Sequence, residues 1–321
     1  MTYFLGVDGG GTKTLAAICD ADGHVLGSGL GGPSNIDDVG LEVATANIAQ
    51  AVRAARAVAG LEPQPFAGAF LGLAGVVSER DRALVHGIAQ RLELAKLTGV
   101  NHDCHIALAG GLSGRSGAVL IVGTGSSCYG VGGSGQSWRS GGWGSLISDE
   151  GSGYFLGRDG LIAAVRSLDG RGPTSSLARA LLKRLGVMHP DDLLHRLYVT
   201  GLTRTEIAAL APITLGCAAD GDEAALEIVE RGCDLLAECV AAVAKHLRLE
   251  RFELVVVGGL YSESLLVQNM LQGTLLQSIP QCRIVSPELP PVLGACLLAL
   301  EQSGAASSAV IERLKLERAR I

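Results

Sequence analysis

Aromatic residues and long apolar segments are scarce in this chain. Phe, Trp and Tyr make up only 4% of its 321 residues, and the formal net charge is −6. The chain therefore lacks the basic, aromatic surface by which proteins usually bind nucleic acids. Its longest apolar runs, such as Ala118 to Val122, have the length of a strand and are too short to span a bilayer. We expect neither nucleic acid nor a membrane among its partners.

Paired cysteines are also missing. The chain has eight cysteines, but none forms a Cys-x-x-Cys pair, and its first residues do not resemble a signal peptide. In a chain of this length, scattered cysteines are typical of reduced, mostly buried thiols. The sequence therefore predicts a cytoplasmic protein. His102 and His105 could share a helix face beside Asp103 and Cys104, but one such pair does not make a four-ligand zinc site.

Glycine is abundant, with 45 of the 321 residues, against a usual share of ~7%. The most informative cluster follows the apolar strand that begins at Phe4, where Asp8 precedes three glycines and a Thr-Lys-Thr. A second strand follows, so the segment predicts a hairpin whose turn presents backbone amides to an anion. A nucleotide phosphate is the obvious anion, and Asp8 is placed to hold a hydrated Mg²⁺. The alternative is an ordinary glycine-rich hairpin.

Two better-known glycine motifs fit less well. A P-loop needs Gly-Lys-Ser/Thr at the start of a helix, but here Thr12 separates Gly11 from Lys13 and a strand follows. A Gly-x-Gly-x-x-Gly pattern begins at Gly130, yet no helical pattern comes after it. Neither motif explains the first hairpin.

The pattern of the first hairpin recurs later in the chain. Three antiparallel strands open the first half, which continues in the order βββαβαβα. A strand beginning at Ala118 then runs into a second Gly/Thr turn, and aligning Leu5 with Leu120 places Gly10 on Gly125. Since the length also favours two domains, we expect an α/β fold of two similar halves. Their phosphate turns would lie on opposite walls of one cleft, where ligands bind between domains.

Four motifs together resemble the sugar kinase, hsp70 and actin ATPase superfamily: DGGGTKT, GTGSS, Gly141–Gly144 with Asp149–Ser152, and the late VVVGG. Within it the chain resembles the N-acetylglucosamine kinases of the BadF/BadG/BcrA/BcrD group. The resemblance implies two ribonuclease H-like domains facing a central cleft. The first would cover residues 1–113, joined by a C-terminal helix over 306–321, and the larger second would cover 114–305. The family resemblance also suggests a homodimer.

The resemblance further implies a role for individual residues toward ATP, Mg²⁺ and an amino sugar. Asp8 would serve Mg²⁺. The phosphates would lie at Gly10, Gly11, Thr12 and Lys13 on one turn and at Thr124, Gly125 and Ser126 on the other. Gly258 and Gly259 would lie under the adenosine, with Ala211 opposite. Asn35, Asp103, Gly142, Trp143, Gly144 and Asp149 would hold the sugar.

Asp103 would be the catalytic base. It follows the strand that begins at Leu97, and the carboxyl end of a strand is where such folds place functional groups. Phosphoryl transfer to an alcohol needs an acceptor for the hydroxyl proton. The family more often shows Asn-Asp where this chain has Asn101, His102 and Asp103.

Structural roles are the alternatives for several of these residues. Asp103 could be a helix N-cap, Asp149 could cap the helix that follows it, and Asn35 could be a turn residue after Pro33.

The leading functional hypothesis is ATP-dependent phosphorylation of the 6-hydroxyl of N-acetylglucosamine, with glucosamine as the alternative substrate. An ATP-driven activator of the same broad group is a second hypothesis, but such proteins carry cysteines for an iron–sulfur cluster. A sugar sensor is a third, and transcriptional sensors usually add a helix-turn-helix, for which no room precedes Phe4. The presence of both Asp8 and Asp103 favours the kinase.

Overall fold

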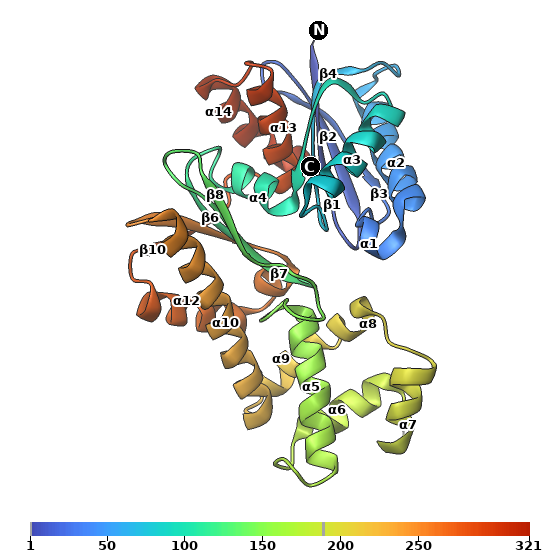
Figure 1. Cartoon of the computed structure of the whole chain (residues 1–321), viewed down its shortest axis with the longest axis vertical. Coiled ribbons are helices and arrows are strands. Elements are labelled where there is room, and N and C mark those ends of the chain that lie inside the picture. The colour runs from blue at the N-terminus through green and yellow to red at the C-terminus, as the bar shows by residue number, and fades with distance from the viewer. Residues whose placement is uncertain (1, 188–189) are drawn as a thin grey trace. The chain divides into compact units, whose positions relative to one another are not determined.

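The computed structural model describes residues 2–187 and 190–321, which form two compact units (Figure 1). Unit 1 comprises Met1–Gly117 and Ser286–Ile321, and unit 2 comprises Ala118–Val285. The chain therefore leaves unit 1, builds unit 2 and returns.

The sheet of unit 1 has the strand order β3-β2-β1-β4-β5. Its strands are β1 (Tyr3–Gly9), β2 (Thr14–Asp20), β3 (Val25–Gly31), β4 (Phe66–Leu73) and β5 (Ala95–His102). Strands β1, β2 and β3 form antiparallel pairs, whereas β4 runs parallel to both β1 and β5. The carboxyl ends of β1, β4 and β5 therefore meet at one edge of the sheet.

Helices cover both faces of this sheet. They are α1 (Ile36–Val39), α2 (Leu41–Ala59), α3 (Glu79–Arg91), α4 (Asp103–Gly111), α13 (Pro291–Gln302) and α14 (Ser308–Glu317), followed by the 3₁₀ turn η2 (Arg318–Arg320). Alternate residues of β1 point to opposite faces, so Leu5 packs with α2 and α3, while Phe4 packs with α13 and α14. Figure 1 shows α2 and α3 on one side of the sheet and α13 and α14 on the other.

The assignment of α13 to the second domain differs from the structure. The prediction placed residues 114–305 together, but α13 packs into the core of unit 1, and every residue from Val292 to Leu300 is buried there. The backbones approach closely, because a Cβ at Gly6 would lie 2.6 Å from the amide nitrogen of Cys296. An apolar helix pattern predicts burial but does not say against which sheet.

The sheet of unit 2 has the order β10-β9-β6-β7-β8. Its strands are β6 (Gly117–Val122), β7 (Ser126–Val131), β8 (Ser137–Gly141), β9 (Phe252–Val257) and β10 (Cys282–Val285). Read from its other edge, this order reproduces that of unit 1, with β6 in the place of β1. The predicted α/β repeat is therefore confirmed.

The helices of unit 2 are more numerous and enclose one core. They are α5 (Gly153–Leu168), α6 (Ser176–Leu185), α7 (Pro190–Leu194), the π-helix η1 (His195–Val199), α8 (Arg204–Ala208), α9 (Ala211–Ala219), α10 (Glu223–Leu247), α11 (Gly259–Glu263) and α12 (Leu265–Ser278). The core joins β6 and β9 to α5, α10 and α12.

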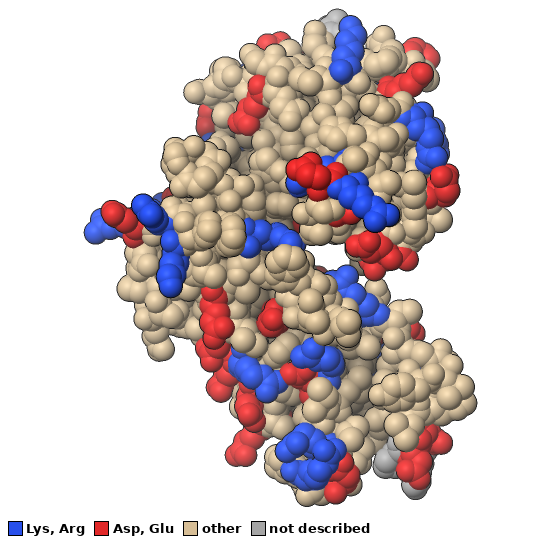
Figure 2. Space-filling view, viewed as in Figure 1, with Lys and Arg blue, Asp and Glu red and all other residues tan. Residues whose placement is uncertain are grey.

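Two surface properties bear on possible partners. Among the described residues, no helix combines the length and the apolar character needed to cross a bilayer. On the face drawn in Figure 2, Lys and Arg lie interspersed with Asp and Glu.

Candidate active site

The first glycine turn joins β1 to β2 in unit 1. The amide of Gly10 donates to the carbonyl of Lys13 at 3.0 Å, which closes the turn. Gly11, Thr12 and Lys13 are exposed at its tip. Within the described residues, no hydrogen bond of the fold uses the amides of Gly11 and Thr12. The tip therefore offers amide donors of the kind that bind a phosphate.

Asn35 lies directly beside this turn. Its amide and that of Ser34 both donate to the carbonyl of Gly10. The Asn35 side chain caps α1, because Oδ1 accepts from the amide of Asp37 at 3.2 Å and Nδ2 donates to Asp38 at 2.7 Å. The structure thus gives Asn35 a capping role, and its contact with a sugar stays a prediction.

Asp8 and Asp103 come to the same edge of the sheet. Gly9, Leu73 and His102 are in register across β1, β4 and β5. Burial and, to a smaller extent, the charge of Asp103 raise the pKa of Asp8, and Lys13 opposes them, so that the pKa lies at about 7.

Two mutually repelling carboxylates suit a divalent cation, because an oxygen-binding cation relieves both their repulsion and their desolvation. The residues present therefore fit Mg²⁺, and Asp8 would hold it.

Asp103 is the first residue of α4, and the N-cap is His102. Nδ1 of His102 accepts from the amide of His105 at 3.2 Å, so the inserted histidine ends β5 and caps the helix. Asp103 itself accepts from the amide of Cys104 at 2.9 Å. The positive end of the helix dipole favours a negative charge at this position. Asp103 is therefore not the cap that the alternative prediction named.

The two neighbouring histidines are held by hydrogen bonds. Nδ2 of Asn101 lies 2.8 Å from Nδ1 of His105, and burial lowers the pKa of His105. Side-chain atoms of His102, Asp103 and Cys104 lie within 4.8 Å of one another. Because Nδ1 of each histidine is already engaged, these contacts support a structural role in fixing the start of α4.

The second glycine turn joins β6 to β7 in unit 2. The segment after Asp149 pins it, because the amide of Gly153 donates to Gly123 at 2.8 Å and that of Tyr154 to Thr124 at 3.1 Å. Within the described residues, the fold does not use the amides of Thr124 and Gly125 as donors. This turn, like the first, leaves amides unused at the carboxyl end of its strand, although Thr124 and Gly125 are half-buried.

Asp149 lies against this turn and is 2% exposed. Its Oδ1 accepts from the amide of Ser126 at 3.3 Å, and its backbone has a φ of +63°. The N-cap of α5 is Ser152, so the alternative capping role of Asp149 is wrong. The Asp149 carboxylate instead contacts the second glycine turn, and its contact with a sugar stays a prediction.

Arg204 is a residue that the sequence did not single out. It is the first residue of α8 and donates from Nη2 to Oδ2 of Asp149 at 2.9 Å. A Cβ at Gly125 would lie 2.5 Å from the same Nη2, so the guanidinium touches the turn. The only local signal is the spacing of Thr203 and Glu206, which form a capping box at the start of α8.

Gly258 lies beside the second turn because β9 runs parallel to β6, with Ile121 opposite Val257. Its φ is +114°, and a Cβ there would lie 2.6 Å from the carbonyl carbon of Val122. Gly259 follows as the first residue of α11. Ala211 begins α9 and is buried in the core, and its position opposite an adenosine stays a prediction.

The segment of Gly142, Trp143 and Gly144 follows β8 as an exposed loop. Both glycines have positive φ, and Nη1 of Arg139 donates to the carbonyl of Gly142 at 2.9 Å. Trp143 is 67% exposed, and the Arg139 guanidinium lies 5.0 Å from the centroid of its ring. The ring is therefore accessible to a ligand from solvent.

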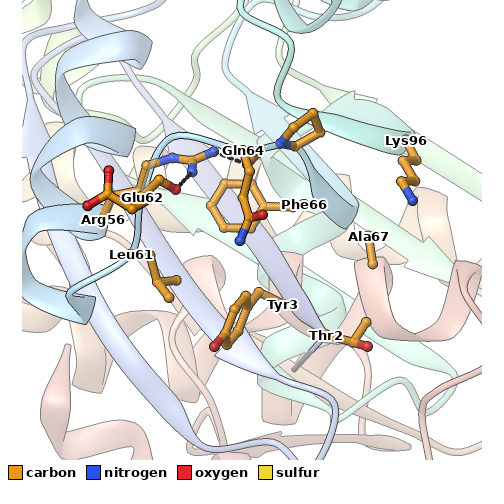
Figure 3. A pocket seen from close by; sticks show the side chains of 10 residues that line it. Thr2, Tyr3, Arg56, Leu61, Glu62, Gln64, Phe66, Ala67 and Lys96 are labelled. Atoms are coloured by element: carbon orange, nitrogen blue, oxygen red, sulfur yellow. Dashed lines mark hydrogen bonds between the residues drawn. The ribbon is translucent and has the colours of Figure 1, made fainter.

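A pocket of about 190 Å³ in unit 1 lies away from these residues. In Figure 3 the Arg56 guanidinium points back to the loop, where it donates to the carbonyls of Glu62 and Gln64. It also packs over Phe66, 4.2 Å from the ring centroid. Because these contacts already use the guanidinium to hold the loop, we explain its place at the pocket by the fold rather than by ligand binding.

Comparison with known proteins places the chain in a family. The model of the BadF/BadG/BcrA/BcrD ATPase family matches residues 5–299. The chain belongs to this family. The predicted membership is confirmed, and with it the fold of two ribonuclease H-like domains, each with a glycine turn after its first strand.

Individual relatives of this ATPase family member cover nearly its whole length. It is 32% identical over 302 residues to the N-acetylmuramic acid/N-acetylglucosamine kinase of Clostridium acetobutylicum, covering 93% of this chain and 98% of the relative. It is 32% identical over 310 residues to the N-acetyl-D-glucosamine kinase of Dictyostelium discoideum, covering 92% and 97%. A solved Chromobacterium violaceum protein assigned as an N-acetylglucosamine kinase has 28% identity and a TM-score of 0.78, covering 94% of this chain and 99% of its own.

Proposed function

We propose that this protein transfers the γ-phosphoryl group of Mg²⁺-ATP to the 6-hydroxyl of N-acetyl-D-glucosamine. The observation that carries the proposal is the pair of acids in unit 1, where Asp8 and Asp103 share the edge of the sheet at which β1 and β5 end. One acid of the pair would bind the metal and the other would accept a proton. Phosphoryl transfer to an alcohol needs both, a cation at the phosphates and an acceptor for the hydroxyl proton.

The two glycine turns would bind the phosphates through the amides that the fold does not use. Gly11 and Thr12 offer them in unit 1, and Thr124 and Gly125 in unit 2. Gly258 would leave room for the nucleotide, since a side chain there would meet the backbone of Val122. Mg²⁺ held by Asp8 would neutralise charge on the phosphates. Most of the rate enhancement would then come from alignment and charge neutralisation.

Asp103 would accept the proton of the sugar hydroxyl as that oxygen attacks. A bond forms between O6 and the γ-phosphorus, the bond from that phosphorus to the bridging β-oxygen breaks, and ADP leaves. A base in this role contributes roughly 10²–10⁴ in rate.

The N-acetylated sugar is the favoured substrate. Two relatives have N-acetylglucosamine in their names, and each is 32% identical to this chain over more than nine-tenths of its length. Trp143 offers an exposed aromatic face and Asp149 a carboxylate, the usual partners of a sugar ring and its hydroxyls. Glucosamine, which carries an ammonium in place of the amide, is the alternative, and a homodimer is the proposed assembly.

The test is ADP release from Mg²⁺-ATP with N-acetylglucosamine, glucosamine, N-acetylmuramic acid, glucose or no sugar. The wild type should release ADP fastest with N-acetylglucosamine, and the product should carry its phosphate on O6 by NMR. Asp103→Asn should reduce kcat by roughly 10²–10⁴. Asp22→Asn, which alters an exposed turn acid of the same unit, should leave kcat unchanged.

Equal turnover with and without sugar would contradict the kinase assignment. An unchanged kcat in Asp103→Asn would leave the reaction in place but remove Asp103 as its base. A higher kcat/KM with glucosamine than with N-acetylglucosamine would correct the substrate.

A further inference from the structure

Asp149 carries a charge in an unusual place for a phosphate site. Its Oδ1 accepts from the amide of Ser126 at 3.3 Å, and a Cβ on Gly125 would lie 2.8 Å from the same oxygen. A carboxylate this close to the turn would repel a phosphate bound there. Something must offset its charge if the turn is to bind a nucleotide.

Arg204 is the group that offsets it. Nη2 donates to Oδ2 of Asp149 at 2.9 Å, with the carboxylate 4% exposed and the arginine side chain 32% exposed. Nη2 also lies against Gly125, and Nε is buried without a partner among the described residues. A charge-assisted bond to a buried carboxylate is strong, and removing one partner leaves the other charge buried and unpaired.

We propose that Arg204 is a positioning residue that couples the sugar site to the phosphate site of unit 2. Its guanidinium fixes Asp149, and Asp149 fixes the amide of Ser126 and hence the second turn. One carboxylate therefore contacts the phosphate turn on one side and, by the proposed function on which this inference rests, the sugar on the other. A sugar that binds to Asp149 therefore changes how the turn binds a phosphate. Arg204 offsets the charge of the carboxylate, so that both ligands can bind.

The coupling has a thermodynamic consequence that a purely structural ion pair lacks. If two ligands act on one carboxylate, each changes the affinity for the other by the same factor. N-acetylglucosamine should change the Kd of Mg²⁺-ADP, and the nucleotide should change the Kd of the sugar equally. Loss of Arg204 should bring that factor toward one while weakening both ligands.

The test compares Arg204→Gln and Arg204→Lys with a matched control, Arg196→Gln. Arg196 belongs to the segment just before α8 and pairs with Glu206 at 3.2 Å, but its guanidinium donates to Gly201 rather than to the turn. In ADP-release assays, Arg204→Gln should raise KM for ATP and for the sugar and lower both kcat/KM values by about tenfold or more. Arg204→Lys should recover part of this loss, and Arg196→Gln should stay within about twofold of the wild type.

Calorimetric binding of Mg²⁺-ADP, with and without N-acetylglucosamine, gives a readout that does not need turnover. Measured well below the melting temperature of either variant, Arg204→Gln should bind ADP more weakly than Arg196→Gln, with the coupling factor reduced. Equal ADP affinity in the two variants, or an Arg204→Gln enzyme with unchanged KM values, would overturn the role of Arg204. If the wild type phosphorylates no sugar, the proposed function fails, and the comparison of ADP affinities still decides whether Arg204 positions the turn.

Discussion

Gly258 shows how a single residue sets the approach of two backbones. Its φ of +114° disfavours any side chain, and a Cβ would lie 2.6 Å from the carbonyl carbon of Val122, the residue before the second turn. Backbone strain of this kind costs about 1–3 kcal/mol. We expect Gly258→Ala to lower the free energy of unfolding by that amount and to raise KM for ATP. Thermal unfolding and ADP-release kinetics measure the two effects.

The adjacent Gly259 provides the control for stability. A Cβ there would meet nothing closer than Oε1 of Glu263 at 3.7 Å, and the residue already belongs to α11. Gly259→Ala should therefore leave the melting temperature close to that of the wild type. If both substitutions destabilise equally, the close approach to Val122 is not the reason for the glycine.

At the residue scale, the acids were easier to predict than their partners. Asp8 directly follows an apolar run, Asp103 follows a strand pattern after Asn101 and His102, and each precedes a turn or helix, so the sequence indicates their place at a strand end. The contact of Asp149 with Ser126 joins residues 23 apart and that with Arg204 joins residues 55 apart. No local pattern encodes such contacts, because they depend on how α5 and α8 pack.

At the scale of the element, variants of two similar helix caps can distinguish an effect on stability from an effect on function. Ser78 caps α3 in unit 1 and Thr203 caps α8 in unit 2, each in a complete capping box. Replacing either residue by Ala should cost about 1 kcal/mol. Because α8 begins with Arg204, only Thr203→Ala should also raise KM for ATP and sugar. Unfolding by urea and steady-state kinetics on both variants measure the two effects. Equal KM values in the two variants would show that the α8 cap does not affect the position of Arg204.

Glu288 ties the loop after α4 to α14 and should make unit 1 sensitive to acid. It accepts from Arg115 and Ser113 at 2.6 Å each and from Lys315 at 2.8 Å. The bond from Arg115, aided by Lys315 and Ser113, lowers the pKa of Glu288 to about 2. The ionised form is favoured in the folded state, so its contribution is present above the ordinary pKa of Glu and is lost as the pH falls toward 2.

Glu288→Gln should therefore destabilise the protein by about 1 kcal/mol at pH 7, and the difference from the wild type should shrink between pH 4.5 and pH 2. Urea unfolding across this range is the measurement. Glu312→Gln is the control, because Glu312 is 69% exposed and pairs only with Lys315 among the described residues. A difference that stays constant with pH would show that Glu288 acts through packing rather than charge.

Elements with a strong apolar pattern could be predicted closely. The helix over 41–59 and the strand over 252–257 match α2 and β9, because six buried positions of α2 recur at helical spacing and β9 is mostly apolar. The strand β8 was missed, since none of its five residues is buried. Its place came from pairing with β7, a contact that the polar sequence of 137–141 does not signal.

The whole molecule consists of one discontinuous and one continuous unit. The core of unit 2 draws only on residues between Ala118 and Ile284, whereas one of the two cores of unit 1 contains Phe4 and Phe70 together with residues of α13 and α14. We therefore expect the fragment 118–285 to fold alone, with a cooperative thermal transition by circular dichroism. The fragment 1–117 should not, because one face of its sheet would expose the apolar side chains that α13 covers.

Joining residue 117 to residue 286 through a short Gly/Ser linker should restore folding of unit 1. The junction keeps β1, β4 and α4 next to α13, where Gly6, Gly110 and Gly294 allow the backbones to approach. A matched polypeptide that carries the same linker but ends before α14 tests the last helix, which adds Val310 and Leu314 to that core. It should fold with a lower melting temperature. A cooperative transition in the fragment 1–117 alone would show that α13 is not required, and with it that unit 1 does not depend on the returning chain.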